Sequence, residues 1–294
     1  MGAGASHRLF SPAMGSPDST PNIPPVFRRQ GEFFVPSEAA PGPWNPEHLH
    51  GGPSAGLLAR ALEREVDDES LHPARLTVDL FRPVPKRPLR VLSSLVRDGR
   101  RIKVGQASLF DGETEVARAS GLFLLRTEMP GFDPGERPKL KGPEGLETTG
   151  LWRGARGAMG VRGFHTVIET RWPEQSEDTP MHIWFRLPCA LVEGEETSTL
   201  CRVAAIGDFA AALASMAGRT RGSGGGPTFM NTDMTHYLSR RPRGQWLAMA
   251  YERNTIDDGI EIAEVSHYDI DGYYGHTVQA RLMMAAPPSF RAGG

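Results

Sequence analysis

A single carboxylate interrupts an apolar stretch of the sequence at residues 201–216, CRVAAIGDFAAALASM. Apart from Arg202 at its start, the stretch predicts a helix that is apolar on every face except at Asp208, and such a helix must be surrounded by other elements. The acid has two interpretations. Asp is a favoured N-cap residue, and Asp208 follows a glycine, as residues at the start of a helix often do. Alternatively, a carboxylate at the positive end of a helix in a largely dry cleft holds and polarises a water molecule.

Other catalytic chemistries have less support in the sequence. The 2 cysteines, Cys189 and Cys201, lie too far apart and lack the paired histidines of a metal site. The glycine-rich residues 222–226 are not followed by the Lys-Ser/Thr pair of a phosphate-binding loop. We therefore expect neither a metal nor an organic cofactor.

The composition argues against several other classes of protein. The chain of 294 residues has a formal net charge of -2 and a pI of about 6.5, whereas nucleic-acid-binding proteins usually carry a basic face. No run of roughly 18 apolar residues predicts a membrane span, and the N-terminus lacks an apolar signal core. Two cysteines do not form a disulfide framework in a chain of this size. We expect a protein of a reducing compartment, the cytoplasm.

Composition shifts along the chain predict two folded units separated by a linker. Residues 1–30 are rich in Gly, Ser and Pro and predict a disordered arm, and residues 31–127 form an N-terminal unit. Pro and Gly dominate residues 128–160, which predict a linker. Residues 161–285 form a C-terminal unit, and residues 286–294 a flexible tail.

Each unit is expected to contain a small-residue helix followed by antiparallel strands. In the first unit the helix follows the turn His50-Gly51-Gly52-Pro53. Its strands are predicted at residues 74–82, 89–97, 102–110 and 114–126. In the second unit, strands are predicted at residues 164–171, 181–186, 229–240, 245–254 and 260–284, the last broken into a hairpin at Asp271-Gly272.

Three landmarks recur in the same order in both halves. Gly51-Gly52 corresponds to Gly207-Asp208, Arg82-Pro83 to Arg241-Pro242, and Asp111-Gly112 to Asp271-Gly272, with offsets of 156, 159 and 160 residues. Nearly constant offsets indicate a duplicated unit, a helix followed by antiparallel strands. The first copy has Gly52 where the second has Asp208, which favours one functional site per chain.

A helix that is apolar all round and followed by strands able to curl about it is typical of the hotdog fold. The repeat, the His50-Gly51-Gly52 turn, the GDFA at 207–210, and the segments FMNTDMTHYLSRRP and HTVQARL together resemble the TesB-like acyl-CoA thioesterases. The resemblance covers roughly residues 31–285. It implies an α+β double hotdog fold, in which each of two tandem units is a curved antiparallel sheet around a central helix. It also implies an acyl-CoA substrate, no cofactor, and a homodimer or higher homo-oligomer.

The resemblance further implies a catalytic set that holds a nucleophilic water against the thioester. Asp208 takes the place of the family's Asp and Gln279 that of its Gln. The family's hydroxyl position falls on Asn231 or on the neighbouring Thr232, and only one of them faces the site because adjacent strand residues point to opposite sides of a sheet. We favour Asn231, whose amide can orient a water much as a hydroxyl does.

Four further residues are expected to line the substrate site, namely His50, Gly51, Gly52 and Gly207, the glycines because they permit close backbone approach. Two other functions stay open at this point. A non-catalytic acyl-CoA-binding or acyl-binding protein is favoured by an asparagine in the hydroxyl position. A thioester hydratase or dehydratase needs an acid or base near a helix start, for which His50 is the candidate.

Overall fold

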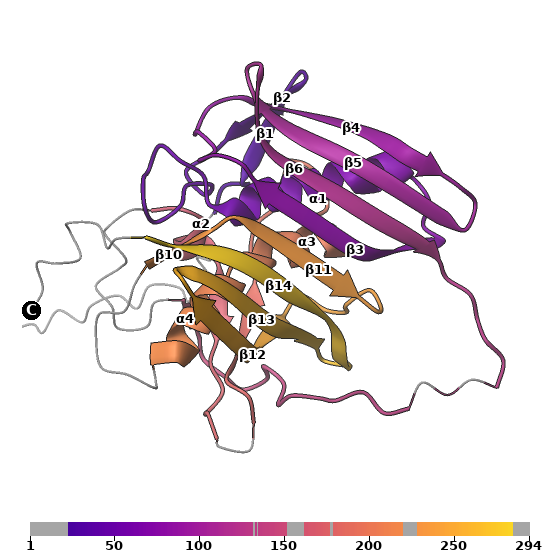
Figure 1. Ribbon diagram of the computed structural model, residues 1–294, viewed down its shortest axis with the longest axis vertical. Coiled ribbons are helices and arrows are strands. Elements are labelled where there is room, and N and C mark those ends of the chain that lie inside the picture. The colour runs from indigo at the N-terminus through magenta and orange to yellow at the C-terminus, as the bar shows by residue number, and fades with distance from the viewer. Residues whose placement is uncertain are drawn as a thin grey trace, which may run out of the picture.

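The computed structural model describes residues 23–284 except Phe132, Pro134 and the ranges 152–161, 177–178 and 220–227. Most of the predicted arm and the whole predicted tail lie outside the described residues. The described strands form one antiparallel sheet of 14 strands, in the order β1-β2-β4-β5-β6-β3-β11-β14-β13-β12-β9-β8-β7, with β10 beside β14. Figure 1 shows α1 and α3 behind this sheet.

The N-terminal strands are β1 (Phe27–Gln30), β2 (Phe33–Pro36), β3 (Leu71–Leu80), β4 (Leu89–Asp98), β5 (Ile102–Asp111) and β6 (Thr114–Leu125). The C-terminal strands are β7 (Thr148–Gly150), β8 (Glu169–Arg171), β9 (His182–Arg186), β10 (Thr228–Asn231), β11 (Asp233–Leu238), β12 (Leu247–Asp257), β13 (Ile260–Asp269) and β14 (Gly272–Met284). The helices are α1 (Gly51–Val66), α2 (Phe164–Val167), α3 (Thr199–Gly207) and α4 (Ala210–Arg219).

Helix α1 begins at Gly51, within the turn predicted at residues 50–53 rather than after it. His50 is its N-cap residue, and Asp67, in the left-handed region with φ 43°, ends it. Leu58 and Leu62 are fully buried where α1 packs on strands β3 to β6. Burial of one such leucine contributes about 1.5–3 kcal/mol, so this apolar stripe holds the helix against the sheet. In the C-terminal unit α4 packs on β12, β13 and β14, and α3 packs against α1.

The two units repeat one topology about a pseudo-two-fold axis. Strands β4-β5-β6-β3 of the first unit meet strands β11-β14-β13-β12 of the second, so that β3 and β11 pair at the centre (Figure 1). Thr77 and Thr235, which are 158 residues apart, face each other there and their hydroxyls lie 3.2 Å apart. The predicted duplication is therefore present in the fold, and the chain is a double hotdog.

The helix predicted over residues 201–216 is divided into α3 and α4. The chain turns at Asp208 and Phe209, where the Phe209 N–H donates to the carbonyl of Ile206 rather than to a residue four positions back. The two helices bend by 41°. No single described helix is long and apolar enough to cross a membrane. Among the described helices, only α3 and α4 counted as one bent segment reach the length and apolar composition of a membrane span.

Four other expected boundaries also differ from the structure. Residues 164–171 are not one strand, because Gly163 and Thr166 cap the one-turn helix α2 before β8 begins. Strand β1 lies within the predicted 1–30 arm, where Phe27 is fully buried and adds to the core. Strand β7 lies within the predicted 128–160 linker, paired with β8. The strand predicted at 229–240 is interrupted at Thr232.

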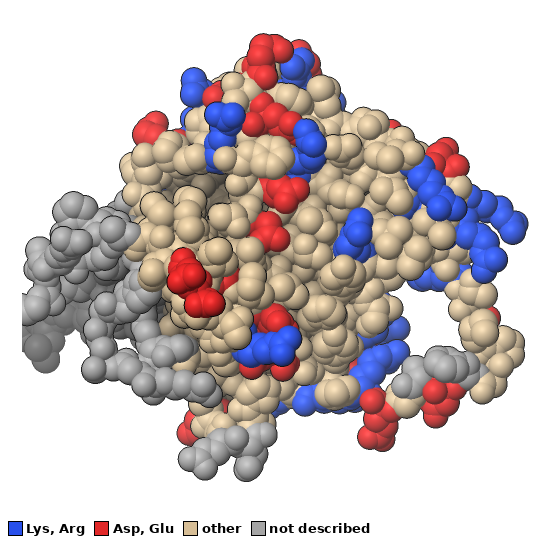
Figure 2. All heavy atoms as spheres, viewed as in Figure 1, with Lys and Arg blue, Asp and Glu red and all other residues tan. Residues whose placement is uncertain are grey.

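Charged side chains are unevenly distributed over the surface. Figure 2 shows Lys and Arg gathered at one edge of this face and much of the remaining described surface uncharged. At the turn between β4 and β5, Arg97, Arg100 and Arg101 line an open hollow of about 550 Å³.

Candidate active site

Asp208 lies where α3 ends, and its carboxylate faces the N-terminus of α1. The side chain is 4% exposed. Oδ2 accepts the Gly52 N–H at 3.0 Å and lies 2.7 Å from His50 Nδ1. The first turn of a helix carries unpaired N–H groups and a partial positive charge, which favour a carboxylate. Asp208 therefore sits at the positive end of a helix, but the helix is that of the other unit.

The proton between His50 and Asp208 can be placed from the geometry. A ring nitrogen and a carboxylate oxygen separated by 2.7 Å must share a proton, because two bare lone pairs would repel at that distance. The Gly52 N–H also lies 3.2 Å from His50 Nδ1, but a protonated Nδ1 cannot accept it. His50 Nδ1 and the Gly52 N–H therefore both donate to Asp208.

These contacts keep Asp208 ionised. Burial alone would raise the pKa of its carboxyl, but attraction to His50 and hydrogen bonds from His50, Asn231 and Gly52 outweigh that effect and lower the pKa below its ordinary value. The result is a buried carboxylate that is charged at neutral pH.

Asn231, and not Thr232, contacts Asp208. The Asn231 Nδ2 donates to Asp208 Oδ1 at 2.7 Å. The Thr232 hydroxyl donates to the carbonyl of Ala280 at 2.8 Å, a bond to the neighbouring strand β14. The interruption between β10 and β11 thus directs the Asn231 side chain toward the carboxylate of Asp208. Its side-chain oxygen, Oδ1, can then accept a hydrogen bond from a ligand or water.

Gln279 projects from the middle of β14 into the interior. It is fully buried, and neither its Nε2 nor its Oε1 has a hydrogen-bond partner among the described residues. Leaving a buried amide unpaired costs roughly 1–3 kcal/mol, so this side chain requires a water or a ligand atom. Gln279 therefore offers a buried N–H donor and a buried carbonyl acceptor to a bound molecule.

The four residues predicted to line the site are close to Asp208 or to its helix, but the glycines serve contacts within the protein. A Cβ on Gly51 would lie 2.7 Å from Asp208 Oδ2, and one on Gly52 would lie 2.2 Å from the carbonyl oxygen of Ala205. A Cβ on Gly207 would lie 2.2 Å from Cε1 of His236. Their missing side chains let α1, α3 and the sheet approach one another, and a role in binding substrate stays a prediction.

Aromatic rings cover the His50 side of the site. The His50 ring centroid lies 4.7 Å from that of Phe209 and 5.5 Å from that of Phe164. Phe185 stacks on Phe209 at 5.8 Å. Phe164, Phe185 and Phe209 are all buried. These rings exclude water from one side of the carboxylate, which strengthens the electrostatic interactions there.

In a row of buried polar residues on the inner face of the C-terminal sheet, only Gln279 was singled out from the sequence. On β14, Thr277, Gln279 and Arg281 all point inward. Arg281 forms a buried ion pair with Glu261 and donates to the Ala211 carbonyl of α4 at 2.7 Å, which ties that helix to the strand. The alternation of these three residues was the available signal, but polar residues at every second position predict an exposed face as readily as a buried one.

The described residues contain no group of three or more His, Cys, Asp or Glu side chains that could hold a metal ion. The side chains that contact Asp208 are instead an amide, Asn231, and a histidine, His50, which can bind and orient water and a carbonyl compound through hydrogen bonds.

Known proteins share both the sequence pattern and the fold. Residues 40–124 match the family model for the acyl-CoA thioesterase N-terminal domain, and residues 134–283 match the model for the C-terminal domain. No curated protein matches the chain by sequence.

Solved structures of low sequence identity share the fold over most of their length. A putative thioesterase from Novosphingobium aromaticivorans is 16% identical with a TM-score of 0.65, and the match covers 90% of this chain and 100% of that one. The TesB protein of Mycobacterium avium subspecies paratuberculosis is 17% identical with a TM-score of 0.63, covering 88% and 96%. A hot dog fold protein of unknown function from Alicyclobacillus acidocaldarius is 16% identical with a TM-score of 0.62, covering 89% and 96%. The two domain matches, which together extend over most of the chain, show that it belongs to the acyl-CoA thioesterase family.

Proposed function

We propose that the protein hydrolyses an acyl-CoA thioester to a free carboxylic acid and CoA by direct attack of water. The observation that carries the proposal is the contact between an ionised, nearly buried Asp208 and Asn231 at 2.7 Å. Gln279, fully buried on the inner face of the same C-terminal unit with no partner for its amide among the described residues, adds support. A thioester is already activated, so its hydrolysis needs a positioned water, a base and hydrogen-bond donors rather than a metal nucleophile.

In this mechanism Asp208 is the general base. The water oxygen bonds to the thioester carbonyl carbon while one water proton passes to the Asp208 carboxylate. The carbon–sulfur bond then breaks and the thiolate of CoA takes up a proton, which regenerates the carboxylate. Asn231 and Gln279 orient the water and the carbonyl group, and the N-terminus of α1 supplies positive potential near the developing charge.

The test is release of free CoA from short-, medium- and long-chain acyl-CoAs, followed with a thiol reagent. We expect wild-type turnover on part of this panel and a loss of about 10²–10⁴-fold in kcat for Asp208→Asn, since the amide cannot take up a proton. Asp271→Asn is the matched control, because Asp271 lies at the β13–β14 turn, where its carboxylate pairs with Arg243. No turnover on any acyl-CoA would favour a non-catalytic acyl-binding protein.

A single turnover in ¹⁸O-labelled water separates the two ways a carboxylate can act. Attack by water places one ¹⁸O atom in the released acid and none in the protein. Attack by Asp208 itself would form an anhydride, and water that opens it at the Asp208 carboxyl carbon would leave label in the peptide that contains Asp208.

One observation favours a second candidate function. His50 Nδ1 donates to Asp208, which is how a carboxylate orients a histidine that acts as acid or base at its other nitrogen. Such a pair suits addition of water to an unsaturated acyl thioester. Loss of the double bond of an enoyl-CoA without release of CoA, sensitive to His50→Gln, would identify this activity.

A further inference from the structure

Four buried side chains form a second polar group in the C-terminal unit, and one of them, His236, lies against Gly207, the residue before Asp208. Thr277 Oγ1 on β14 lies 2.6 Å from His236 Nδ1 on β11 and at hydrogen-bond distance, 2.5 Å, from His267 Nε2 on β13. The hydroxyl of Tyr274 lies 3.5 Å from His267 Nδ1. All four side chains are buried. The mechanism proposed above uses none of them.

The fold itself does not require these polar residues. In the N-terminal unit, residues 158 positions earlier have the same register, since Val78 pairs with Ala119 as His236 pairs with Thr277. The four equivalent positions there are apolar and buried: Val78, Leu109, Val116 and Ala119. The same sheet thus exists with an apolar interior in one copy and a hydrogen-bonded polar chain in the other.

The hydroxyl of Thr277 requires both histidines to carry their proton on the same type of ring nitrogen. A hydroxyl has one proton, so Thr277 donates to one imidazole nitrogen and accepts an N–H from the other. In one arrangement His236 and His267 are both protonated on Nδ1. In the other, both are protonated on Nε2, and His236 then presents an N–H at its far end.

Two contacts select the second arrangement. A buried phenol must donate its proton, and among the described residues the hydroxyl partner of Tyr274 is His267 Nδ1, which is therefore bare. At the other end of the chain, the negative charge of Asp208 acts on His236. That charge favours an N–H over a lone pair on Nε2, the ring nitrogen that does not contact Thr277.

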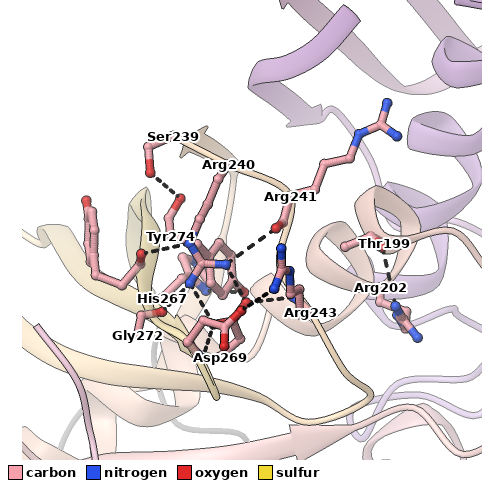
Figure 3. A network of polar contacts seen from close by, with 12 residues as sticks. Thr199, Arg202, Ser239, Arg240, Arg241, Arg243, His267, Asp269, Gly272 and Tyr274 are labelled. Atoms are coloured by element: carbon pink, nitrogen blue, oxygen red, sulfur yellow. Dashed lines mark hydrogen bonds and ion pairs between the residues drawn. The ribbon is translucent and has the colours of Figure 1, made fainter. Parts of the chain in front are cut away.

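The outer end of the chain is held in place by an ion pair. Figure 3 shows Tyr274 and His267 beside Arg240 and Asp269. Arg240 donates to both oxygens of Asp269 at 2.6 Å and to the carbonyl of Gly272 at 2.7 Å, and its guanidinium lies 5.7 Å from the centre of the Tyr274 ring. These bonds fix the β13–β14 hairpin and with it the tyrosine.

The inner end faces the site. His236 Nε2 is buried and has no hydrogen-bond partner among the described residues. The ring lies against Gly207, the residue before Asp208, where a Cβ would meet Cε1 at 2.2 Å. Because His236 is opposite Thr277, it is diagonal to Gln279 on the same inner face. Burial lowers the pKa of His236 to about 4, so the ring is neutral and does not compete for the charge of Asp208.

We propose that Tyr274, His267 and Thr277 form a directional hydrogen-bond chain that fixes His236 as the Nε2–H tautomer, so that His236 is a further hydrogen-bond donor to the water or acyl oxygen held between Asp208 and Gln279. Tyr274, His267 and Thr277 are positioning residues, because they act through His236. The catalytic use of this donor rests on the proposed hydrolysis, whereas the direction of the chain does not.

Imidazole ¹⁵N chemical shifts of ¹⁵N-histidine-labelled protein test the direction without substrate. The protein contains 9 histidines. The signals of His236 and His267 are assigned by their loss from the spectra of the His236→Gln and His267→Gln variants. We expect bare Nδ1 and protonated Nε2 in both rings of the wild type. Tyr274→Phe removes the terminal donor and should raise the Nδ1–H population of both rings together. Protonated Nδ1 in either wild-type ring would overturn the proposal.

Kinetics of threonine variants test the use of the donor. Thr277→Val should lower kcat about 10- to 100-fold with little change in KM, as removal of a partner that fixes a histidine tautomer commonly does, and Thr277→Ser should restore kcat. Thr235→Val is the control, since that hydroxyl bonds Thr77 on the other face of the sheet. A Thr277→Val enzyme with unchanged kcat would overturn the catalytic role. A wild type inactive on every thioester would instead overturn the proposed function, and the ¹⁵N shifts would still decide the direction of the chain.

Discussion

The two copies of the repeat share a topology but differ in what they bury. Facing α1, the N-terminal sheet presents small and apolar residues such as Ala107, Ala119 and Gly121. At the position equivalent to Gly121, 158 residues later, the C-terminal sheet carries Gln279. A hydrophobic core is enough to hold the fold, as the first copy shows. The polar interior of the second copy lowers stability locally and is retained beside Asp208, which indicates that function selects it.

The two halves nevertheless build the site together. The carboxylate comes from the C-terminal unit, while the helix N-terminus and the histidine that bind it come from the N-terminal unit. Duplication thus supplied two helices that meet, and divergence gave one an acid and left the other a glycine at Gly52.

Among variants that make the two copies more alike, the largest effect is expected for Gln279→Met, which makes the C-terminal interior resemble the N-terminal one. We expect kcat to fall about 10²–10³-fold, the size typical of losing a donor to developing charge. The free energy of unfolding should rise by about 1 kcal/mol, because an unpaired buried amide is replaced by an apolar chain of similar size. CoA release and urea unfolding measure the two effects. Gln106→Met, on the outer face of β5, is the control, and a Gln279→Met enzyme with wild-type kcat would exclude Gln279 from the site.

The next largest effect is expected on the free energy of unfolding, when one glycine from each copy is replaced by alanine. In Gly207→Ala the new Cβ would lie 2.2 Å from Cε1 of the enclosed His236 ring, and in Gly105→Ala it would lie 2.9 Å from Cδ2 of Leu62, the end of a flexible side chain. We expect a loss of about 3 kcal/mol for Gly207→Ala and under about 1 kcal/mol for Gly105→Ala. Equal losses in urea unfolding would show that the C-terminal interior is no more tightly constrained than the N-terminal one.

Substitutions of the two neighbouring residues at the β10–β11 interruption, Asn231 and Thr232, should differ clearly in their effect on kcat. Asn231→Ala removes the contact with Asp208 and should lower kcat about 10-fold or more, and Asn231→Thr should recover part of the loss. Thr232→Val removes only the bond to the Ala280 carbonyl, so kcat should stay within about twofold. The reverse order of effects would mean that Thr232 faces the substrate.

The smallest effect is a difference in pH dependence of stability. Burial lowers the pKa of His236, and it also holds the pKa of His267 well below its ordinary range. Above about pH 6.5 both are neutral in the folded and unfolded states; below it the unfolded chain binds protons that the folded chain does not, so stability falls toward pH 4. Each histidine contributes up to about 1.4 kcal/mol per pH unit. His236→Val, the residue type at Val78, should flatten the slope by that amount in urea unfolding between pH 6 and pH 4.5, and an unchanged slope would mean that His236 is protonated in the folded protein.

The sequence was sufficient to predict the repeat, the central helices and most strands, because apolar periodicity and turn residues report local structure. It did not predict the break at Asp208, since that turn depends on contacts with His50 and Gly52 in the other unit. The separation of Asn231 from Thr232 required the strand register. His236 shows the same limit: it follows Met234 at the spacing of an inward-facing strand residue, but its partners Thr277 and His267 lie on two other strands.

The central claim is that one site per chain is formed around Asp208 of the C-terminal copy. Isothermal titration with a thioether analogue of a turned-over acyl-CoA, which cannot be hydrolysed, measures it directly. The account predicts one analogue bound per chain, competitive with substrate, and a clear loss of affinity in Asn231→Ala. Binding of two analogues per chain would contradict this claim. So would binding of one analogue with the same affinity in the wild type and in Asn231→Ala.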